Sequence, residues 1–170
     1  MTYFERVHKM IDQIPMETVT LLVESLKDVR ERGNTVYVVG NGGSYANAQH
    51  LVLHLRDVNI KAFDLMADNA WLTAKSNDFG YHNALITLLD VVFRPGDMLL
   101  VISGSGNSEN IKEAVRMIRA IGESCGGLLG NGGGRVAPYI PHAIVLPELD
   151  YGPLEDCFSV VVHILHEALK

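Results

Sequence analysis

Over the first thirty residues, apolar side chains recur three and four positions apart, which is the spacing of one buried face of a helix. Pro15 lies inside this region. Because proline lacks an N–H and clashes with the preceding helical turn, we expect two helices or one bent helix here. The helical pattern ends at Gly33 and Asn34. Residues 1–33 are therefore predicted to form a helical segment that precedes the rest of the fold.

From residue 34 onwards, strand-like and helix-like stretches alternate. Residues 35–39 are β-branched or aromatic with no polar alternation, as expected for a strand buried in a parallel sheet. The other strand candidates are residues 62–66, 98–103, 126–129 and 143–146, and helical stretches cover residues 45–56, 69–76, 83–93, 109–121 and 154–169. This alternation predicts one α/β domain over residues 1–170, whose core (residues 34–170) is a parallel sheet with helices on both faces.

Composition narrows the class of protein. The chain has 14 Lys and Arg against 20 Asp and Glu, so its net charge is −6, which does not suit a general nucleic-acid binder or a basic membrane-binding surface. Two cysteines are too few for a disulfide framework. No signal-peptide pattern is present, and no apolar stretch approaches the roughly 18 residues of a membrane span. We expect a cytoplasmic domain with no nucleic-acid or membrane partner.

Two glycine- and serine-rich loops each follow a predicted strand and lead into a predicted helix: residues 40–44 (Gly-Asn-Gly-Gly-Ser) and residues 103–108 (Ser-Gly-Ser-Gly-Asn-Ser). Ligands of open parallel sheets bind beyond the carboxyl ends of the strands, and free N–H groups at a helix start attract anions. Neither loop has the lysine of a nucleotide P-loop, and Tyr45 stands where the dinucleotide fingerprint requires glycine. A single loop of this kind often only turns the chain, but two at neighbouring strand ends favour a phosphate-bearing ligand.

Histidines provide a second kind of candidate chemistry. His50 and His54 lie four residues apart and therefore on one face of a helix, at an ordinary spacing for zinc ligands, although such pairs are also often structural. His163 interrupts an apolar run of the last helix, where it needs either a hydrogen-bond partner, such as a backbone carbonyl, or a functional role. His166 is expected to be exposed to solvent.

Several of these motifs, in this order, resemble the phosphoheptose isomerases of the sugar isomerase (SIS) domain superfamily. They are residues 40–44, Ala48-Gln49-His50, residues 76–81, residues 102–108 and Val162-His163-Ile164-Leu165. The resemblance implies a three-layer αβα sandwich with a five-stranded parallel sheet. It also implies a homotetramer with sites between subunits, and the interconversion of sedoheptulose 7-phosphate and D-glycero-manno-heptose 7-phosphate.

The resemblance also implies which residues form the site. The phosphate would be bound by three serines of the second loop, and the sugar by residues of the first loop and of the 76–81 motif. The full substrate-binding set is Asn41, Gly42, Gly43, Ser44, Asn77, Asp78, Ser103, Gly104, Ser105 and Ser108. His50 would be a zinc ligand, and His163 a zinc ligand or an acid–base group.

Two positions depart from the family pattern. The family has a catalytic glutamate four residues after the metal-binding histidine, where this chain has His54. The family's metal-binding glutamine on the last helix matches Glu155, with Asp156 as the alternative. The expected zinc ligands are therefore His50, His54, Glu155 and His163, a set of three nitrogens and one oxygen.

The same departures change the expected catalytic groups. Glu155 is the best carboxylate for the base, and His163 or His54 would move a proton between the two substrate oxygens. If zinc takes Glu155 and both histidines of the first helix, His163 is the remaining acid–base group.

Helix geometry adds a constraint on this metal set. Glu155 and His163 are eight residues apart, which is about 12 Å along a straight helix. Either the last helix begins after Glu155, or His163 of the partner subunit completes the set, and we expect the second arrangement.

Two other functions stay open. The first is a non-catalytic SIS domain that binds a phosphosugar as a regulator or scaffold, which loss of the family's glutamate would suit. The second is an isomerase of a different sugar phosphate, with Tyr45, His82 and Tyr151 reshaping the pocket. The glycine run at residues 130–134 is expected to be a flexible loop.

Overall fold

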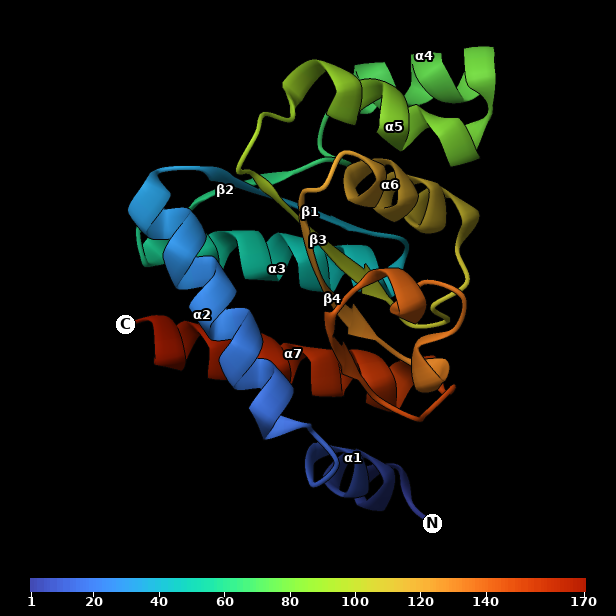
Figure 1. Cartoon of the computed structure of the whole chain (residues 1–170). Coiled ribbons are helices and arrows are strands. Elements are labelled where there is room, and N and C mark those ends of the chain that lie inside the picture. The colour runs from blue at the N-terminus through green and yellow to red at the C-terminus, as the bar shows by residue number, and fades with distance from the viewer.

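The computed structural model describes residues 1–170 and contains a five-stranded sheet in the order β2-β1-β3-β4-β5 (Figure 1). All four strand pairs are parallel. The strands are β1 (Thr35–Gly40), β2 (Lys61–Asp64), β3 (Met98–Ser103), β4 (Ser124–Leu129) and β5 (His142–Val145). The central strand β3 is buried along its whole length, as its continuous apolar sequence predicts.

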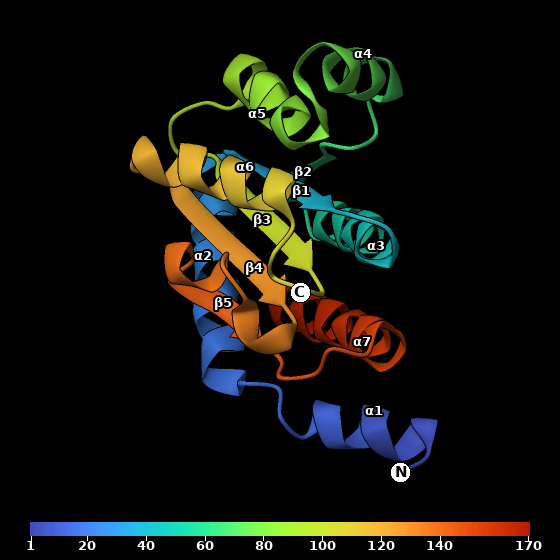
Figure 2. The ribbon, with the colours of Figure 1, turned by 90° about the vertical axis from the view of Figure 1, so that its right-hand side faces the viewer.

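Seven α-helices surround the sheet: α1 (Tyr3–Ile11), α2 (Met16–Arg32), α3 (Gly43–Asp57), α4 (Asn69–Phe79), α5 (Tyr81–Val92), α6 (Glu109–Ala120) and α7 (Tyr151–Leu169). Helices α2, α3 and α7 cover one face of the sheet, while α5 and α6 cover the other and α4 packs beside α5 (Figures 1 and 2). The expected three-layer αβα sandwich is therefore confirmed.

Each face of the sheet has its own apolar core, and successive side chains of a strand pack alternately into one core and the other. On β3, Leu100 and Ile102 pack with α2, α3 and α7, whereas Leu99 and Val101 pack with α5 and α6. This follows from the two-residue period of a strand, which points successive side chains to opposite faces of the sheet.

The N-terminal segment forms two helices, as Pro15 predicts. A capping box between Thr2 and Glu5 starts α1, and Pro15 stands at the N-cap of α2. Gly33 ends α2 with a φ of +71°, a left-handed conformation that glycine adopts without strain.

The predicted elements all occur, and the differences lie at their ends. Strand β2 ends at Asp64 rather than at residue 66, because the Asp64 carboxylate accepts a hydrogen bond from the Met66 N–H and turns the chain. Helix α7 begins at Tyr151 rather than at residue 154, since Pro153 falls in the first turn, where its missing N–H has no intrahelical partner to lose. None of the helices combines the length and the apolar character that a membrane span needs.

Candidate functional site

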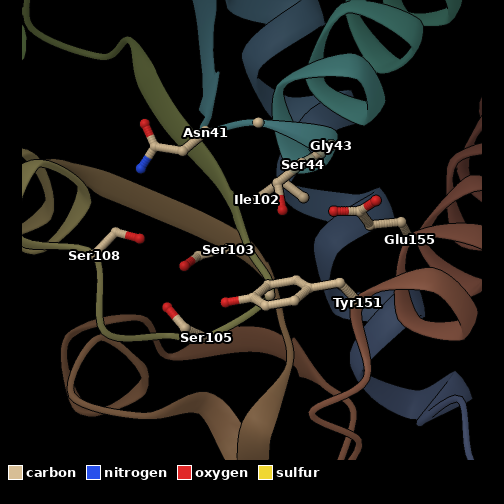
Figure 3. Close-up of a pocket in the computed structure, with 11 residues that line it drawn as sticks. Asn41, Gly43, Ser44, Ile102, Ser103, Ser105, Ser108, Tyr151 and Glu155 are labelled. Atoms are coloured by element: carbon tan, nitrogen blue, oxygen red, sulfur yellow. The ribbon is translucent and has the colours of Figure 1, made fainter.

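The two glycine- and serine-rich loops lie side by side at one edge of the sheet. Strands β1 and β3 are adjacent, and their register pairs Gly40 with Ile102, so both strands end at the same level. The loops and the start of α7 enclose a cavity of about 310 Å³ (Figure 3). It is lined by Asn41, Gly42, Gly43, Ser44, Ile102, Ser103, Gly104, Ser105, Ser108, Tyr151 and Glu155.

Serine hydroxyls of the second loop converge on one part of this cavity (Figure 3). The Ser103 Oγ accepts a hydrogen bond from the Gly106 N–H at 3.1 Å, and the Ser105 Oγ accepts one from the Asn107 N–H at 3.1 Å. Because these oxygens act as acceptors within the loop, and neither hydroxyl donates to a protein atom, both keep their hydrogens for a ligand. Such a pair of donors suits an anionic group that only accepts hydrogen bonds.

The N-terminus of α6 adds further donors beside the serines. Ser108 is the N-cap of this twelve-residue helix, and its side chain makes no capping hydrogen bond. The first N–H groups of a helix have no intrahelical acceptor and carry a partial positive charge. Together with the serine hydroxyls, they form a site suited to a phosphate group.

Glu155 brings a carboxylate to the same cavity from α7 (Figure 3). Its carboxylate lies so close to Gly43 that an added Cβ there would stand 2.1 Å from Glu155 Oε2, and the Glu155 side chain would have to move. Burial, and then the neighbouring Asp156, raises the pKa of Glu155. A partly desolvated carboxylate beside a polar cavity is suited to act as a base.

The cavity residue Asn41 is fixed by a small polar network. Its amide exchanges two hydrogen bonds with the Asn110 amide, at 2.9 and 3.0 Å, and accepts a third from the Tyr81 hydroxyl at 2.6 Å. Asn110 is only 2% exposed. Sequence reasoning missed it, although a polar residue on the buried face of α6, next to Ile111, was a visible signal.

Three histidines come together between α3 and α7. One ring nitrogen each of His50, His54 and His163 lie within 4.8 Å of one another, and the Nε2 atoms of His50 and His54 are 2.9 Å apart. Burial, and then the neighbouring histidines, lowers the pKa of His50 and of His54, which favours the neutral rings that metals bind. Three neutral imidazoles fit a zinc ion, and the exposed side chain of His163 leaves one side open.

Glu155 does not join this cluster, and the expected four-ligand set is divided. Helix α7 begins before Glu155, and the eight-residue spacing separates Glu155 from His163 as helix geometry requires. Of the two expected arrangements, a last helix that begins after Glu155 is therefore wrong, while the chain's own His163 lies beside His50 and His54.

The physical cause is the direction of the two helices. Asn47 of α3 donates to the Glu155 backbone oxygen at 2.9 Å, and Asp57 of α3 pairs with His166 at 2.9 Å. Helices α3 and α7 therefore run side by side in the same direction, with the cavity residues at one end and the histidines further along.

Three other expected positions differ in the structure. Asn77 and Asp78 lie on the exposed side of α4 and do not line the cavity. The prediction that His166 is exposed is wrong, since its side chain is only 11% exposed and packs against the His54 ring, with 4.4 Å between ring centroids.

Comparison with known proteins places the chain in a family. A family model described as SIS domain matches residues 2–130. The fold and this match define the chain as a SIS domain protein. It is 33% identical to the phosphoheptose isomerase of Geotalea daltonii over 172 residues, which covers 98% of this chain and 90% of that protein.

Solved structures agree with this relationship. A phosphoheptose isomerase from Neisseria gonorrhoeae superposes with a TM-score of 0.90 at 26% identity, over 96% of this chain and 91% of that one. One from Francisella tularensis gives 0.89 at 25% identity, over 98% and 91%. The chain therefore belongs to the phosphoheptose isomerase family, and it is an isomerase.

Proposed function

We propose that this protein isomerises a phosphorylated sugar, interconverting sedoheptulose 7-phosphate and D-glycero-manno-heptose 7-phosphate. The observation that carries the proposal is that a single cavity holds free hydroxyl donors on one side and the Glu155 carboxylate on another. The relatives named phosphoheptose isomerase support the same substrate class.

In this proposal the second loop binds the phosphate. Ser103, Ser105 and Ser108 donate hydrogen bonds from their hydroxyls, and the N-terminus of α6 adds N–H donors and a favourable dipole. The remaining cavity residues contact the sugar: Asn41, Gly42, Gly43, Ser44, Gly104 and Tyr151.

Glu155 is the proposed base. It removes a proton from C1 of the ketose, the electron pair forms the C1–C2 double bond of an enediol, and the proton returns to C2. Over the same reaction O1 loses a proton and O2 gains one. We assign this transfer to His163 or His54, which lie further along the same two helices.

His50, His54 and His163 form the proposed zinc site in this chain, and whichever of His54 and His163 moves the proton is not a zinc ligand in that step. A zinc ion bound there would supply Lewis-acid stabilisation of negative charge on a substrate oxygen. The lowered pKa of His50 and His54 supports this assignment, because a protonated imidazole cannot bind a metal.

We further propose that the protein assembles as a homotetramer. Large apolar side chains are exposed on several elements, including Phe4 on α1 (77% exposed) and Phe79 on α4 (53% exposed). Such side chains are available for contacts between subunits.

The reaction assay tests the proposed activity. Purified protein supplied with zinc should convert sedoheptulose 7-phosphate into the aldose, and it should not convert sedoheptulose, which lacks the phosphate. A rate no higher than that of a Glu155→Ala, His163→Ala double variant refutes the proposal.

One observation favours a second candidate function. His54 stands where the family has its catalytic glutamate, as a non-catalytic phosphosugar-binding protein would tolerate. Stoichiometric zinc in the purified protein together with turnover supports the isomerase, whereas sugar-phosphate binding with neither zinc nor turnover supports the binding protein.

A further inference from the structure

The glycine run at residues 130–134, expected to be a flexible loop, packs directly on the serine loop. The Gly130 N–H donates to the Ser103 backbone oxygen at 3.0 Å, and beyond the run the Val136 N–H donates to the Gly106 oxygen at 3.0 Å. The contact is so close that a Cβ on Gly106 would lie 2.3 Å from the Gly133 oxygen. The glycine run therefore packs against the proposed phosphate-binding loop and is not a free flexible loop.

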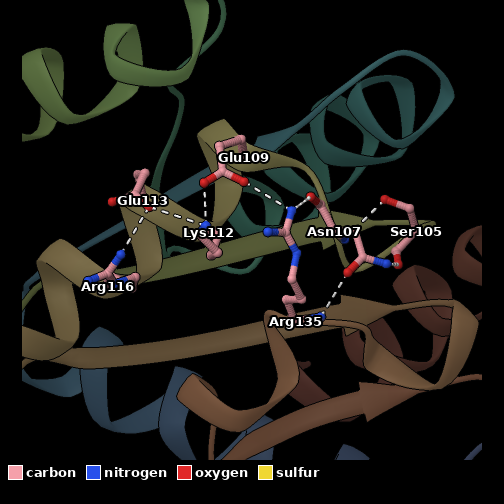
Figure 4. Close-up of polar contacts among 7 residues, drawn as sticks. All are labelled: Ser105, Asn107, Glu109, Lys112, Glu113, Arg116 and Arg135. Atoms are coloured by element: carbon pink, nitrogen blue, oxygen red, sulfur yellow. Dashed lines mark hydrogen bonds and ion pairs between the residues drawn. The ribbon is translucent and has the colours of Figure 1, made fainter.

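Arg135, at the end of the glycine run, holds Asn107 of the serine loop from two sides (Figure 4). Its backbone N–H donates to Asn107 Oδ1 at 3.0 Å, and its guanidinium Nη2 donates to the Asn107 backbone oxygen at 3.0 Å. The same Nη2 reaches Glu109 Oε2 at 3.0 Å, on the first residue of α6. Arg135 thus ties the loop to the helix that follows it.

Asn107, held by Arg135, in turn makes two hydrogen bonds to Ser105. Its backbone N–H donates to the Ser105 Oγ at 3.1 Å, and its side-chain amide donates to the Ser105 backbone oxygen at 2.8 Å. All four polar groups of Asn107 are therefore paired, two with Arg135 and two with Ser105. Because the Asn107 N–H occupies a lone pair of the Ser105 Oγ, it fixes where the hydroxyl hydrogen can point.

We propose that Arg135 is a positioning residue for phosphate binding, which acts through Asn107 to hold the Ser105 hydroxyl as a donor facing the cavity. Arg135 does not line the cavity itself. The inference rests on the proposed function, since it assumes that Ser105 binds the phosphate of the substrate.

Arg116 supplies a matched comparison on the same surface. It pairs with Glu113 at 3.2 Å, further along α6, and makes no hydrogen bond to the serine loop (Figure 4). Arg116 and Arg135 are similarly exposed, with 53% and 58% of their side-chain surface accessible. Replacing either one removes the same charge from the protein, but only Arg135 contacts Asn107.

The test compares Arg135→Gln with Arg116→Gln in the full-length protein. It measures kcat and KM for sedoheptulose 7-phosphate and the dissociation constant of inorganic phosphate by calorimetry. Because charge-assisted hydrogen bonds to the loop are lost, Arg135→Gln should raise KM and the phosphate dissociation constant about 3- to 10-fold, with kcat within about twofold. Arg116→Gln should leave all three values within about twofold of wild type.

Ser105→Ala separates the inference from the proposed function. If Ser105→Ala weakens phosphate binding and Arg135→Gln does not, the role of Arg135 is wrong and the phosphate site stands. If neither variant weakens it, the proposed phosphate site is itself wrong. Should Arg135→Gln fail to fold, Arg135→Lys is measured instead. Lysine keeps the charge but lacks the planar guanidinium and its reach, so it should give the same loss in smaller degree.

Discussion

The raised pKa of Glu155 links the environment of one side chain to the pH dependence of the reaction. A base must be deprotonated to accept a proton, so activity is lost as the pH falls through the pKa of Glu155. Burial first, and the charge of Asp156 second, raises that pKa above its ordinary value of 4.5. The acidic limb of kcat/KM should therefore lie above pH 4.5.

A single substitution tests this cause. Asp156→Asn removes the neighbouring negative charge, so the pKa of Glu155 should fall and the acidic limb should move to lower pH, with the plateau rate near wild type. The measurement is kcat/KM against pH for both proteins. An unchanged limb would show that another group controls it.

Single substitutions in the histidine cluster should also change how much zinc the protein binds. His50→Ala removes one of three converging imidazoles and should cost the protein most of its bound zinc after dialysis against a weak chelator. His8→Ala, an exposed histidine on α1, should keep the wild-type zinc content. Elemental analysis measures the zinc content of both variants. Equal zinc content in the two would show that the histidine cluster is not the metal site.

At the scale of elements, local patterns predicted which segments are helices and strands, because burial on one face leaves its period in the sequence. The β-branched run of β1 and the helical spacing of α2 are examples. The position of Glu155 relative to His50 and His54 of α3 was not predictable in the same way. It depends on how α7 lies beside α3, and no periodicity along one helix records the direction of its neighbour.

Helix α3 offers a matched pair for measuring how much its packing stabilises the fold. Leu51 is fully buried in the core beneath the sheet, whereas Leu53, two residues later, is 62% exposed. Leu51→Ala should lower the free energy of unfolding by about 2–5 kcal/mol through lost burial and a cavity. Leu53→Ala should change it by less than about 1 kcal/mol.

Urea unfolding of the two variants, followed by circular dichroism, provides the comparison. Equal losses would mean that Leu53 is buried in the assembled protein, as a subunit contact would require.

At the scale of the whole molecule, the cavity joins residues from Asn41 to Glu155, and the motifs found in the sequence supply most of its lining. The side-chain contacts that hold the cavity loops in place could not be predicted from the sequence. Asn110 and Arg135 act through side-chain hydrogen bonds to distant loops, and only the folded arrangement brings these partners together.

The location of all three histidines in one chain makes a prediction about assembly. Zinc content should not depend on whether subunits are associated, since His163 of the same chain lies with His50 and His54. Zinc per chain measured across a dilution series, with the oligomeric state followed by light scattering, should stay constant. Loss of zinc that follows dissociation would show that a partner subunit completes the site.

The most direct measurement of the central claim is isomerisation of sedoheptulose 7-phosphate in D₂O, followed by NMR. The wild-type protein should form the aldose with deuterium on the carbon next to the aldehyde, because the proton passes through a base that exchanges with solvent. Glu155→Gln should lower this rate by about 10²- to 10⁴-fold, the usual contribution of a general base. No aldose from the wild-type protein, or an equal rate from Glu155→Gln, would contradict the account.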